Sequence, residues 1–316
     1  MLGRFWEGLS GPLAERWAGV AAPAAVFWLG GLLAWARGRG GLDALGDVTG
    51  WLDRQQTGTQ AAALVAVLVA VGASAAVVER FTAPALRLLE GYWPRGLGRL
   101  ADHLIAKVRR RATSDEDAWQ RLAPRVWATP ATATADELAR FSRLDQRRRR
   151  RPAAPDRCLP TRLGNILRAA ESRPADKYGL DAVALWPRLW LVLPDTTRRE
   201  LLAARGALDR TVAVAVWGLL FGAFTVWDPL ALPVGLTVSL IAVTLWAPPR
   251  AELFADLLEA AYDLHRVALY QQLRWPLPAN PAQEAAYGRQ LSAYLWRGSD
   301  APHPTFTPPE GSGPRP

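Results

Sequence analysis

Residues 212–247 read VAVAVWGLLFGAFTVWDPLALPVGLTVSLIAVTLWA, and Asp228 is the single charge among them. An uncharged run lies on either side of Asp228-Pro229, from Val212 to Trp227 and from Leu230 to Ala247. Runs of this length approach the roughly 20 residues with which a helix crosses a hydrocarbon core of about 30 Å. Because the residue before a proline avoids α geometry, the chain can reverse between the runs. The stretch therefore predicts a tight transmembrane hairpin.

Two similar runs lie near the N-terminus. Trp17 to Ala36 carries no charge, and neither does Ala61 to Val78, which ends against Glu79 and Arg80. Amphipathic surface helices need a polar face, so four separate charge-free runs favour membrane spans. We therefore expect an all-α membrane protein with two transmembrane helical hairpins, its four spans lying at about residues 17–36, 60–79, 211–227 and 229–247.

Two other interpretations of these runs compete. The runs could form buried helical hairpins in a large soluble core, because the third run is short for a span. Alternatively, Ala34-Trp35-Ala36 matches the small-residue pattern of a signal-peptide cleavage site, and cleavage would remove the first run. The acidic residues Glu7 and Glu15 ahead of that run, and its length, favour a retained anchor over a cleaved leader.

Basic residues near the ends of the runs predict the orientation. They follow the second run, precede the third and follow the fourth, at Arg80, Arg87, Arg95, Arg99, Arg198, Arg199, Arg205, Arg210, Arg250 and Arg266. The turn at Asp228 carries none, and the first run has arginines on both sides. The positive-inside rule then places both termini and the segment between the hairpins in the cytoplasm, with the hairpins in the cell (plasma) membrane.

Charge and proline content divide the rest of the chain. From Arg80 to Arg210, Lys and Arg number 27 against 15 Asp and Glu, so the protein's excess positive charge lies here. Helical patterns cover residues 84–111, 137–151 and 161–172, with Pro- and Thr-rich breaks between them and no alternating strand pattern. The expected parts are an N-terminal hairpin (1–80), a basic, mainly helical cytoplasmic segment (81–210), a second hairpin (211–247), a C-terminal amphipathic helical region in the cytoplasm (248–298) and a disordered tail (299–316).

Five consecutive arginines stand out in the basic segment: Arg147, Arg148, Arg149, Arg150 and Arg151. Such a cluster cannot be buried together without a large desolvation cost, so it must face solvent or anions. It fits a clamp for anionic lipid headgroups, a site for nucleic acid phosphates, or a solvated linker. Nucleic acid is the least favoured of the three.

The apolar stretch from Tyr178 to Pro194 is the most distinctive in sequence. Trp186 and Trp190 lie four residues apart, on one helix face, but Pro187 between them fits only a first helical turn. With Arg188, these tryptophans could lie at a membrane interface, where indole and guanidinium groups both find partners. Alternatively, they pack the domain against itself.

Helix boundaries can also be predicted in the second half of the chain. Thr197 and Glu200 have capping-box spacing, so a helix should start near Thr197 and continue into the third span. Pro248 and Pro249 should open a further helix. Its apolar face is predicted to be Leu253, Leu257, Ala261, Leu264 and Ala268, opposite Glu252, Asp256, Glu259 and Asp263. A last helix should follow an Asn280 N-cap, with Pro281 and Gln283 at N1 and N3, and end near Arg297.

Few residues in the sequence point to chemistry. The three histidines, His103, His265 and His303, have no ligand spacing, and the single cysteine, Cys158, cannot form an intrachain disulfide. The spans hold no ionisable residue of the kind that ion-coupled transport requires, and no phosphate-binding loop occurs. We therefore expect no enzyme activity, cofactor or metal.

In Tyr178–Pro194 and Ala261–Gly298, with Tyr-Asp-Leu-His, Leu-Arg-Trp-Pro-Leu-Pro and Tyr-Leu-Trp-Arg-Gly, the chain resembles uncharacterised multi-pass membrane proteins of actinobacteria. This resemblance implies no activity. The expected function is a non-enzymatic anchor, scaffold or sensor that presents its basic segment to anionic lipid or to a cytosolic partner. The alternative is a pore subunit that oligomerises through small residues such as Gly72, Ala73, Ala76, Gly218 and Gly222.

Overall fold

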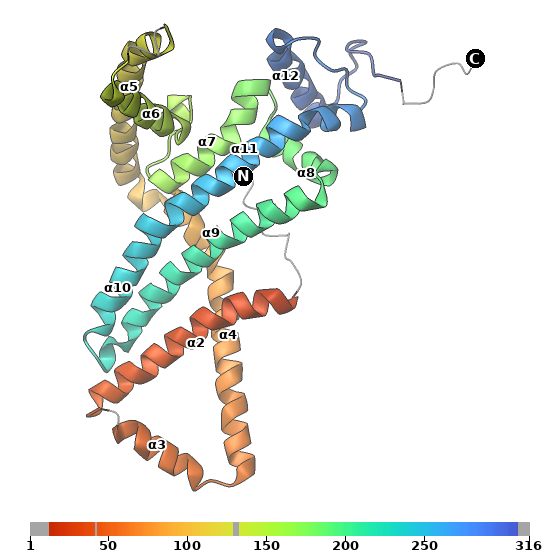
Figure 1. Ribbon diagram of the computed structural model, residues 1–316. Helices are drawn as coiled ribbons and strands as arrows, with labels where there is room; N and C mark the ends of the chain where they lie inside the picture. The colour runs from red at the N-terminus through yellow and green to blue at the C-terminus, as the bar shows by residue number, and fades with distance from the viewer. Residues whose placement is uncertain (1–12, 42, 129–132, 309–316) are drawn as a thin grey trace. The chain divides into compact units, whose positions relative to one another are not determined.

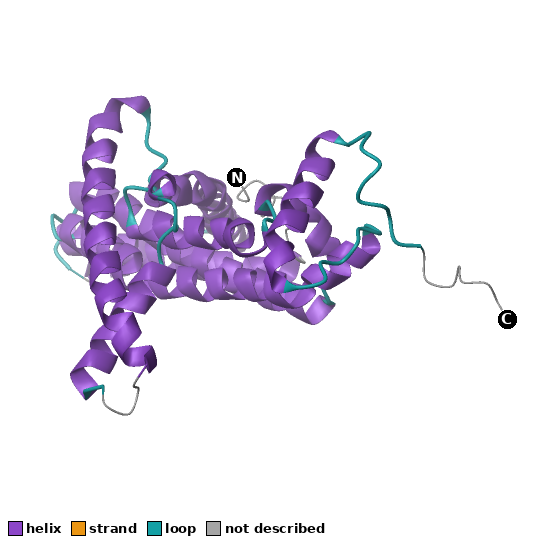
Figure 2. Cartoon of the chain, turned by 90° about the horizontal axis from the view of Figure 1, so that it is seen from above, coloured by secondary structure: helices purple, strands orange, loops and turns teal. Residues whose placement is uncertain are grey.

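The computed structural model describes residues 13–41, 43–128 and 133–308, and every regular element in these ranges is a helix (Figure 1, Figure 2). The helices form two compact units. We call the one that extends to Leu88 and includes Gly206–Pro249 the apolar unit. The polar unit comprises Leu89–Arg205 and the chain from Arg250 onward.

The apolar unit holds the predicted hairpins. It contains α2 (Leu13–Gly38), α3 (Asp43–Asp53), most of α4 (Thr57–Glu90), the second half of α9 (Asp195–Phe221), η4 (Gly222–Val226), α10 (Ala231–Ile241) and η5 (Ala242–Trp246). The short helix α3 was not predicted. Its residues lie between the first two charge-free runs.

Within the described residues, three helical stretches are long and apolar enough to cross a membrane: Thr57–Ala128, Asp195–Val226 and Ala231–Gln272. They contain three of the four predicted spans. The remaining predicted span, residues 17–36, is helical throughout as part of α2. The side chains of residues 13–21 lie outside the description.

Helices α9 and α10 form the predicted hairpin and pack through small residues. A Cβ added to Gly218 would lie 2.8 Å from the carbonyl oxygen of Gly235 and 2.5 Å from Oγ of Ser239. Ser239 Oγ donates a hydrogen bond to the carbonyl oxygen of Ala215 at 2.8 Å. In apolar helices, small residues allow this close backbone approach and a hydroxyl adds an interhelical bond. Gly218 therefore packs within one chain, against Gly235 and Ser239.

Aromatic side chains fill the space between α2 and this hairpin. The ring of Phe27 lies 4.7 Å from Trp217 and 5.0 Å from Phe224, centroid to centroid. A Cβ on Gly31 of α2 would lie 2.2 Å from the Phe224 ring, so only glycine leaves room for it. Arg37 Nε, at the end of α2, contacts Oδ2 of Asp228 at 3.2 Å. The Asp228 carboxylate also accepts the Leu230 N–H, which fixes the predicted turn.

The outward faces of α10 and of the charge-free run of α4 are largely apolar. On α10, the buried residues Ala231, Gly235 and Ser239 recur every fourth position, while the side chains between them are exposed. On α4, the exposed fractions of Leu64, Leu68 and neighbouring valines reach about 60% (62% for both leucines). Water-soluble surfaces rarely carry contiguous apolar areas of this kind, so these faces suit lipid contact.

The polar unit is held by a separate core. It contains η1 (Arg95–Leu97), α5 (Gly98–Ala128), α6 (Ala135–Arg149), η3 (Pro155–Arg157), α7 (Arg162–Tyr178), α8 (Ala182–Val192), the start of α9, most of α11 (Ala247–Gln272) and α12 (Pro281–Arg297). Trp186 of α8 and Tyr262 of α11 are fully buried, with ring centroids 5.8 Å apart. Four leucines of the same segment are also at 0% exposure: Leu180 just before α8, Leu185 and Leu189 of α8, and Leu201 of α9.

Helix α4 does not end at Pro84, so the helix start predicted at residue 84 is wrong. The helix continues to Glu90, and Gly91 then adopts a φ of 100°, in the left-handed region that favours glycine. A Cβ on Gly91 would also lie 2.5 Å from Cγ of Pro160. The helix end is thus fixed by a distant contact that the local sequence does not reveal.

The predicted breaks around residues 123–134 and 152–160 are found in part. Helix α5 continues through Pro124 to Ala128, and residues 129–132 lie outside the description. Thr134 then caps α6 in a capping box, in which Glu137 accepts the Thr134 N–H at 3.0 Å. That hydrogen bond lowers the pKa of Glu137. Thr161 caps α7, as its predicted helix start requires.

Two predictions about prolines are wrong, whereas the predicted start of α9 agrees with the structure. Pro187 lies inside α8, well past its first turn, because the surrounding apolar side chains are buried and hold the helix together. Helix α9 starts at Asp195, two residues before Thr197, and continues into the third charge-free run, as predicted. Pro248 and Pro249 do not open a new helix, since the π-helical η5 joins α10 to α11 without a break.

The C-terminal elements follow the prediction more closely. Asn280 Oδ1 accepts the Gln283 N–H at 3.2 Å and caps α12, which ends at Arg297. The first part of the predicted tail is nevertheless in contact with the polar unit. The Phe306 ring lies 6.2 Å from Trp275, and Thr307 N–H donates to Arg274 at 2.9 Å. Residues 309–316 lie outside the description.

Candidate interaction surfaces of the polar unit

The five arginines at the end of α6 contact carboxylates of the same chain. Arg147 and Arg151 both pair with Asp115 of α5, and Arg148 forms two bonds with Glu116, at 2.6 and 3.2 Å. Arg149 pairs with Asp145 one turn earlier, and Arg150 pairs with Glu252 of α11. The cluster is therefore an intramolecular clasp, and only Arg147 and Arg149 keep most of their side-chain surface exposed.

Arg148 has a second role in joining α5 to α6. Its guanidinium carbon lies 3.7 Å from the ring centroid of Trp119, within the range of a cation–π contact. The Trp119 ring stacks in turn on Phe141 of α6 at 6.0 Å. The two helices lie side by side in Figure 1. The sequence prediction missed Asp115 and Glu116 because it treated the arginines without their partners.

A ladder of charged contacts joins α7 to one side of α11. Glu252 forms an ion pair with Arg162 at 3.2 Å. Glu259 forms ion pairs with Lys177, at 2.5 Å, and with Arg173. Asp263 Oδ1 accepts a hydrogen bond from Tyr178 Oη at 2.6 Å. Burial and this bond to a carboxylate raise the pKa of Tyr178 to about 12. We call these contacts the α7–α11 ladder.

The acids of the ladder were predicted to form the polar face of α11, but the opposite apolar face was assigned incorrectly. The buried side chains are Phe254, Leu258, Tyr262 and Leu269, and of the predicted apolar set only Ala261 is fully buried. Leu253 and Leu264 are 55% and 74% exposed. Helix α11 therefore has two apolar sides, and the predicted side faces outward.

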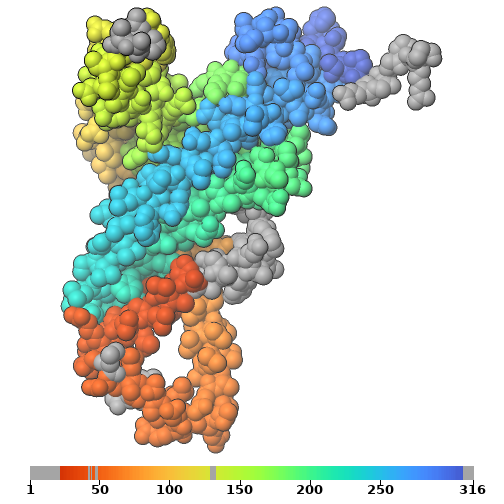
Figure 3. Space-filling view, viewed as in Figure 1, coloured from red at the N-terminus to blue at the C-terminus, as the bar shows by residue number. Residues whose placement is uncertain are grey.

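The exposed apolar side of α11 has a regular spacing. Leu253, Leu257, Ala260, Leu264 and Val267 recur at intervals of four, three, four and three residues. This is the spacing with which one helix presents a seam to another. Figure 3 shows α11, in light blue, at the surface on the face in view. We call these five residues the α11 seam.

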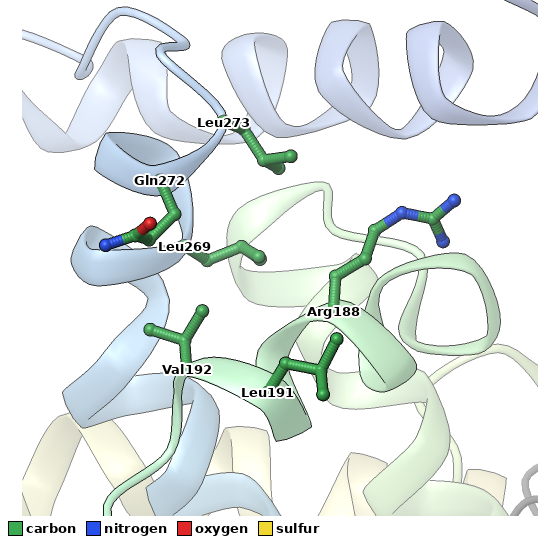
Figure 4. Close-up of a pocket in the computed structure, with 6 residues that line it drawn as sticks. All are labelled: Arg188, Leu191, Val192, Leu269, Gln272 and Leu273. Atoms are coloured by element: carbon green, nitrogen blue, oxygen red, sulfur yellow. The ribbon is translucent and has the colours of Figure 1, made fainter. Parts of the chain in front are cut away.

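The predicted lipid contacts of α8 are divided between core and surface. Trp186 is 0% and Trp190 6% exposed, so both tryptophans pack the unit against itself, as the alternative interpretation held. Arg188 is exposed and donates to the Ala184 carbonyl oxygen at 2.5 Å, in the turn disturbed by Pro187. It borders a shallow pocket of about 490 Å³. Figure 4 shows this pocket between the ends of α8 and α11, lined by Arg188, Leu191, Val192, Leu269, Gln272 and Leu273.

The titratable residues do not converge on a reactive centre within the described ranges. No group of three or more His, Cys, Asp or Glu side chains is placed there to hold a metal ion. Cys158 is buried, and burial raises the pKa of its thiol. No protein-family model, curated protein or solved structure matches the chain. The candidate sites of the described residues are therefore surfaces.

Proposed function

We propose that this chain is an integral membrane scaffold that crosses the bilayer four times, keeps both termini and the polar unit in the cytoplasm, and binds a protein partner on the α11 seam. Three helical stretches long enough to cross a bilayer support the membrane assignment, as do the exposed apolar faces of α4 and α10. The arginines beside the charge-free runs support the orientation.

The α11 seam is the observation that carries the scaffold proposal. Leu264 exposes 74% of its surface on a helix whose other sides are fixed by the core and by the α7–α11 ladder. An apolar row on a rigid helix is the surface onto which an amphipathic helix of another protein packs. Exposed apolar patches rimmed by charged residues mark such interfaces in general.

The topology can be tested with reporter fusions placed after Gly50, after Arg150 and at the C-terminus. We expect the reporter at Gly50 to be active only outside the cytoplasm, and the other two only inside. An Arg150 reporter found outside would contradict the orientation. Recovery of a shortened chain that starts after Ala36 would replace the first span with a cleaved leader.

Partner binding can be tested by placing a photo-crosslinking residue at Leu264 in cells. We expect a discrete adduct with one protein, whereas the same residue at exposed Glu200 of α9 gives none. A Leu253→Ser exchange should remove the adduct and change the free energy of unfolding by less than about 0.5 kcal/mol, since this side chain is exposed. Equal adducts at both positions, or an adduct that survives Leu253→Ser, would contradict a specific seam.

The pore alternative rests on small residues that could pair between chains. Gly218 packs against Gly235 and Ser239 of its own chain, and Gly222 against Leu232. This use within one chain favours the scaffold. Steady ion flux from the purified protein in liposomes would favour the pore instead.

A further inference from the structure

The charges of α5 are sorted between two opposite sides of the helix. Asp115 and Glu116 lie on the side packed against α6, where they pair with Arg147, Arg148 and Arg151. At 100° per residue, the basic residues Arg99, Lys107, Arg110 and Arg121 fall within one narrow arc on the other side. All four are exposed. We call them the α5 stripe.

The stripe residues differ from the predicted arginine cluster in lacking partners. Each arginine of the cluster contacts a carboxylate, whereas no carboxylate among the residues that the structure describes lies within ion-pair distance of a stripe residue. Asp117 is the one acid of α5 within the arc, against the four stripe residues and Arg125. Pairing inside the α5–α6 hairpin thus leaves positive charge unneutralised on the outer side of α5.

The start of the stripe is tied to a candidate membrane span by a short piece of chain. The charge-free run of α4 ends at Val78, and α4 continues as helix to Glu90, which adds about 18 Å at 1.5 Å per residue. Four residues, 91–94, then lead to η1 and α5. Tethering at this distance keeps the concentration of lipid headgroups around the stripe high.

The residues around the start of the stripe also suit a lipid interface. Tyr92, Leu97 and Leu100 are 46%, 45% and 48% exposed. Leu100 lies three and seven residues before His103 and Lys107, on the same side of α5. Amphipathic helices that lie on anionic membranes combine such apolar side chains with a basic face.

We propose that the α5 stripe binds the anionic phospholipid headgroups of the bilayer that anchors the chain, an inference that rests on the proposed membrane location. The stripe binds by charge and not through a shaped pocket. It should therefore bind anionic membranes more strongly than neutral ones, whatever the chemical identity of the anionic headgroup. Each basic residue held near an anionic leaflet strengthens such association roughly fivefold. Duplex DNA offers similar phosphates, but it is not held beside the stripe by the chain.

The test uses the full-length protein with Ser114→Cys in a Cys158→Ala background, since Ser114 is exposed beside the stripe. A fluorophore on residue 114 reports quenching by nitroxide-headgroup lipid in nanodiscs of phosphatidylcholine, with or without phosphatidylglycerol. We expect quenching only with phosphatidylglycerol. Arg99→Gln, Lys107→Gln and Arg110→Gln together should lower the bound-to-free ratio by roughly tenfold or more. The charge-matched control replaces exposed arginines elsewhere in the polar unit: Arg199, Arg289 and Arg297.

The outcomes separate this inference from the membrane proposal. Equal quenching in the stripe variant and the control, or in neutral and anionic nanodiscs, would overturn lipid binding while the chain remains incorporated. Failure of the chain to incorporate at all would overturn the membrane location instead. Inorganic phosphate and duplex DNA serve as soluble competitors in separate arms. Binding of DNA with no response to phosphatidylglycerol would overturn the proposal and reassign the stripe to nucleic acid.

Discussion

Replacing Gly288 of α12 by alanine is expected to destabilise the polar unit by about 3 kcal/mol, at the upper end of the range for overpacking. A Cβ at this position would lie 1.9 Å from the carbonyl oxygen of Tyr178, which is backbone and cannot rotate away. Gly179 makes the reciprocal approach, with its own Cβ position 2.1 Å from the Ala285 carbonyl oxygen. Ser292 Oγ accepts the Asp181 N–H at 2.9 Å. This bond fixes the place where α12 crosses the end of α7.

Hydrogen exchange of the full-length protein measures this effect. Protection of amides in α8 and α12 should fall by about two orders of magnitude, since 1.4 kcal/mol corresponds to tenfold. Gly98→Ala is the matched control, because Gly98 is helical and no atom lies within 4 Å of its Cβ position. Alanine there should be neutral or stabilising. Unchanged protection in Gly288→Ala would show that α7 and α12 are not held at this crossing.

The elements that were predicted correctly are those whose sequence signals lie in residues next to one another. Charge-free runs and N-caps such as Thr161 and Asn280 can be recognised within a few residues, and the structure has helices there. Predictions from the local sequence were wrong where contacts with residues distant in the sequence determine whether a helix continues or ends. Pro187 stays within a helix because Leu185, Trp186 and Leu189 are fully buried around it. The end of α4 depends on Pro160, far along the chain.

The candidate surfaces were harder to predict than the helices. The arginine cluster was conspicuous, but most of its partners lie far away in the sequence, such as Glu252, which is 102 residues from Arg150. On α11, apolar residues occupy two opposite sides, so periodicity alone could not tell the buried side from the exposed one. The α5 stripe was present in the sequence as scattered basic residues. Only the pairing of Asp115 and Glu116 with α6 shows which of the charges remain available.

Replacing Asn165 of α7 by alanine is expected to release the segment that links the arginine cluster to α7. Asn165 is 3% exposed, and its amide nitrogen donates to the carbonyl oxygens of Leu159 and Thr161, each at 2.7 Å. Its Oδ1 accepts the Leu159 N–H at 2.9 Å. Alanine would leave three backbone groups without these partners, at roughly 1 kcal/mol or more for each.

The reactivity of Cys158 reports this release directly, because the thiol is buried next to Leu159 and burial raises its pKa. Native alkylation of the full-length protein requires local opening, so a loss of about 3 kcal/mol should speed the reaction by roughly 100-fold. Asn280→Ala is the matched control. It removes the exposed N-cap of α12, costs about 1 kcal/mol there and should leave Cys158 as slow as in the unaltered protein. Alkylation that is equally slow in Asn165→Ala would mean that other contacts, such as Pro160 against Gly91, hold the segment in place. Alkylation accelerated equally by both exchanges would mean that the polar unit opens as a whole, and that Asn165 does not act on this segment alone.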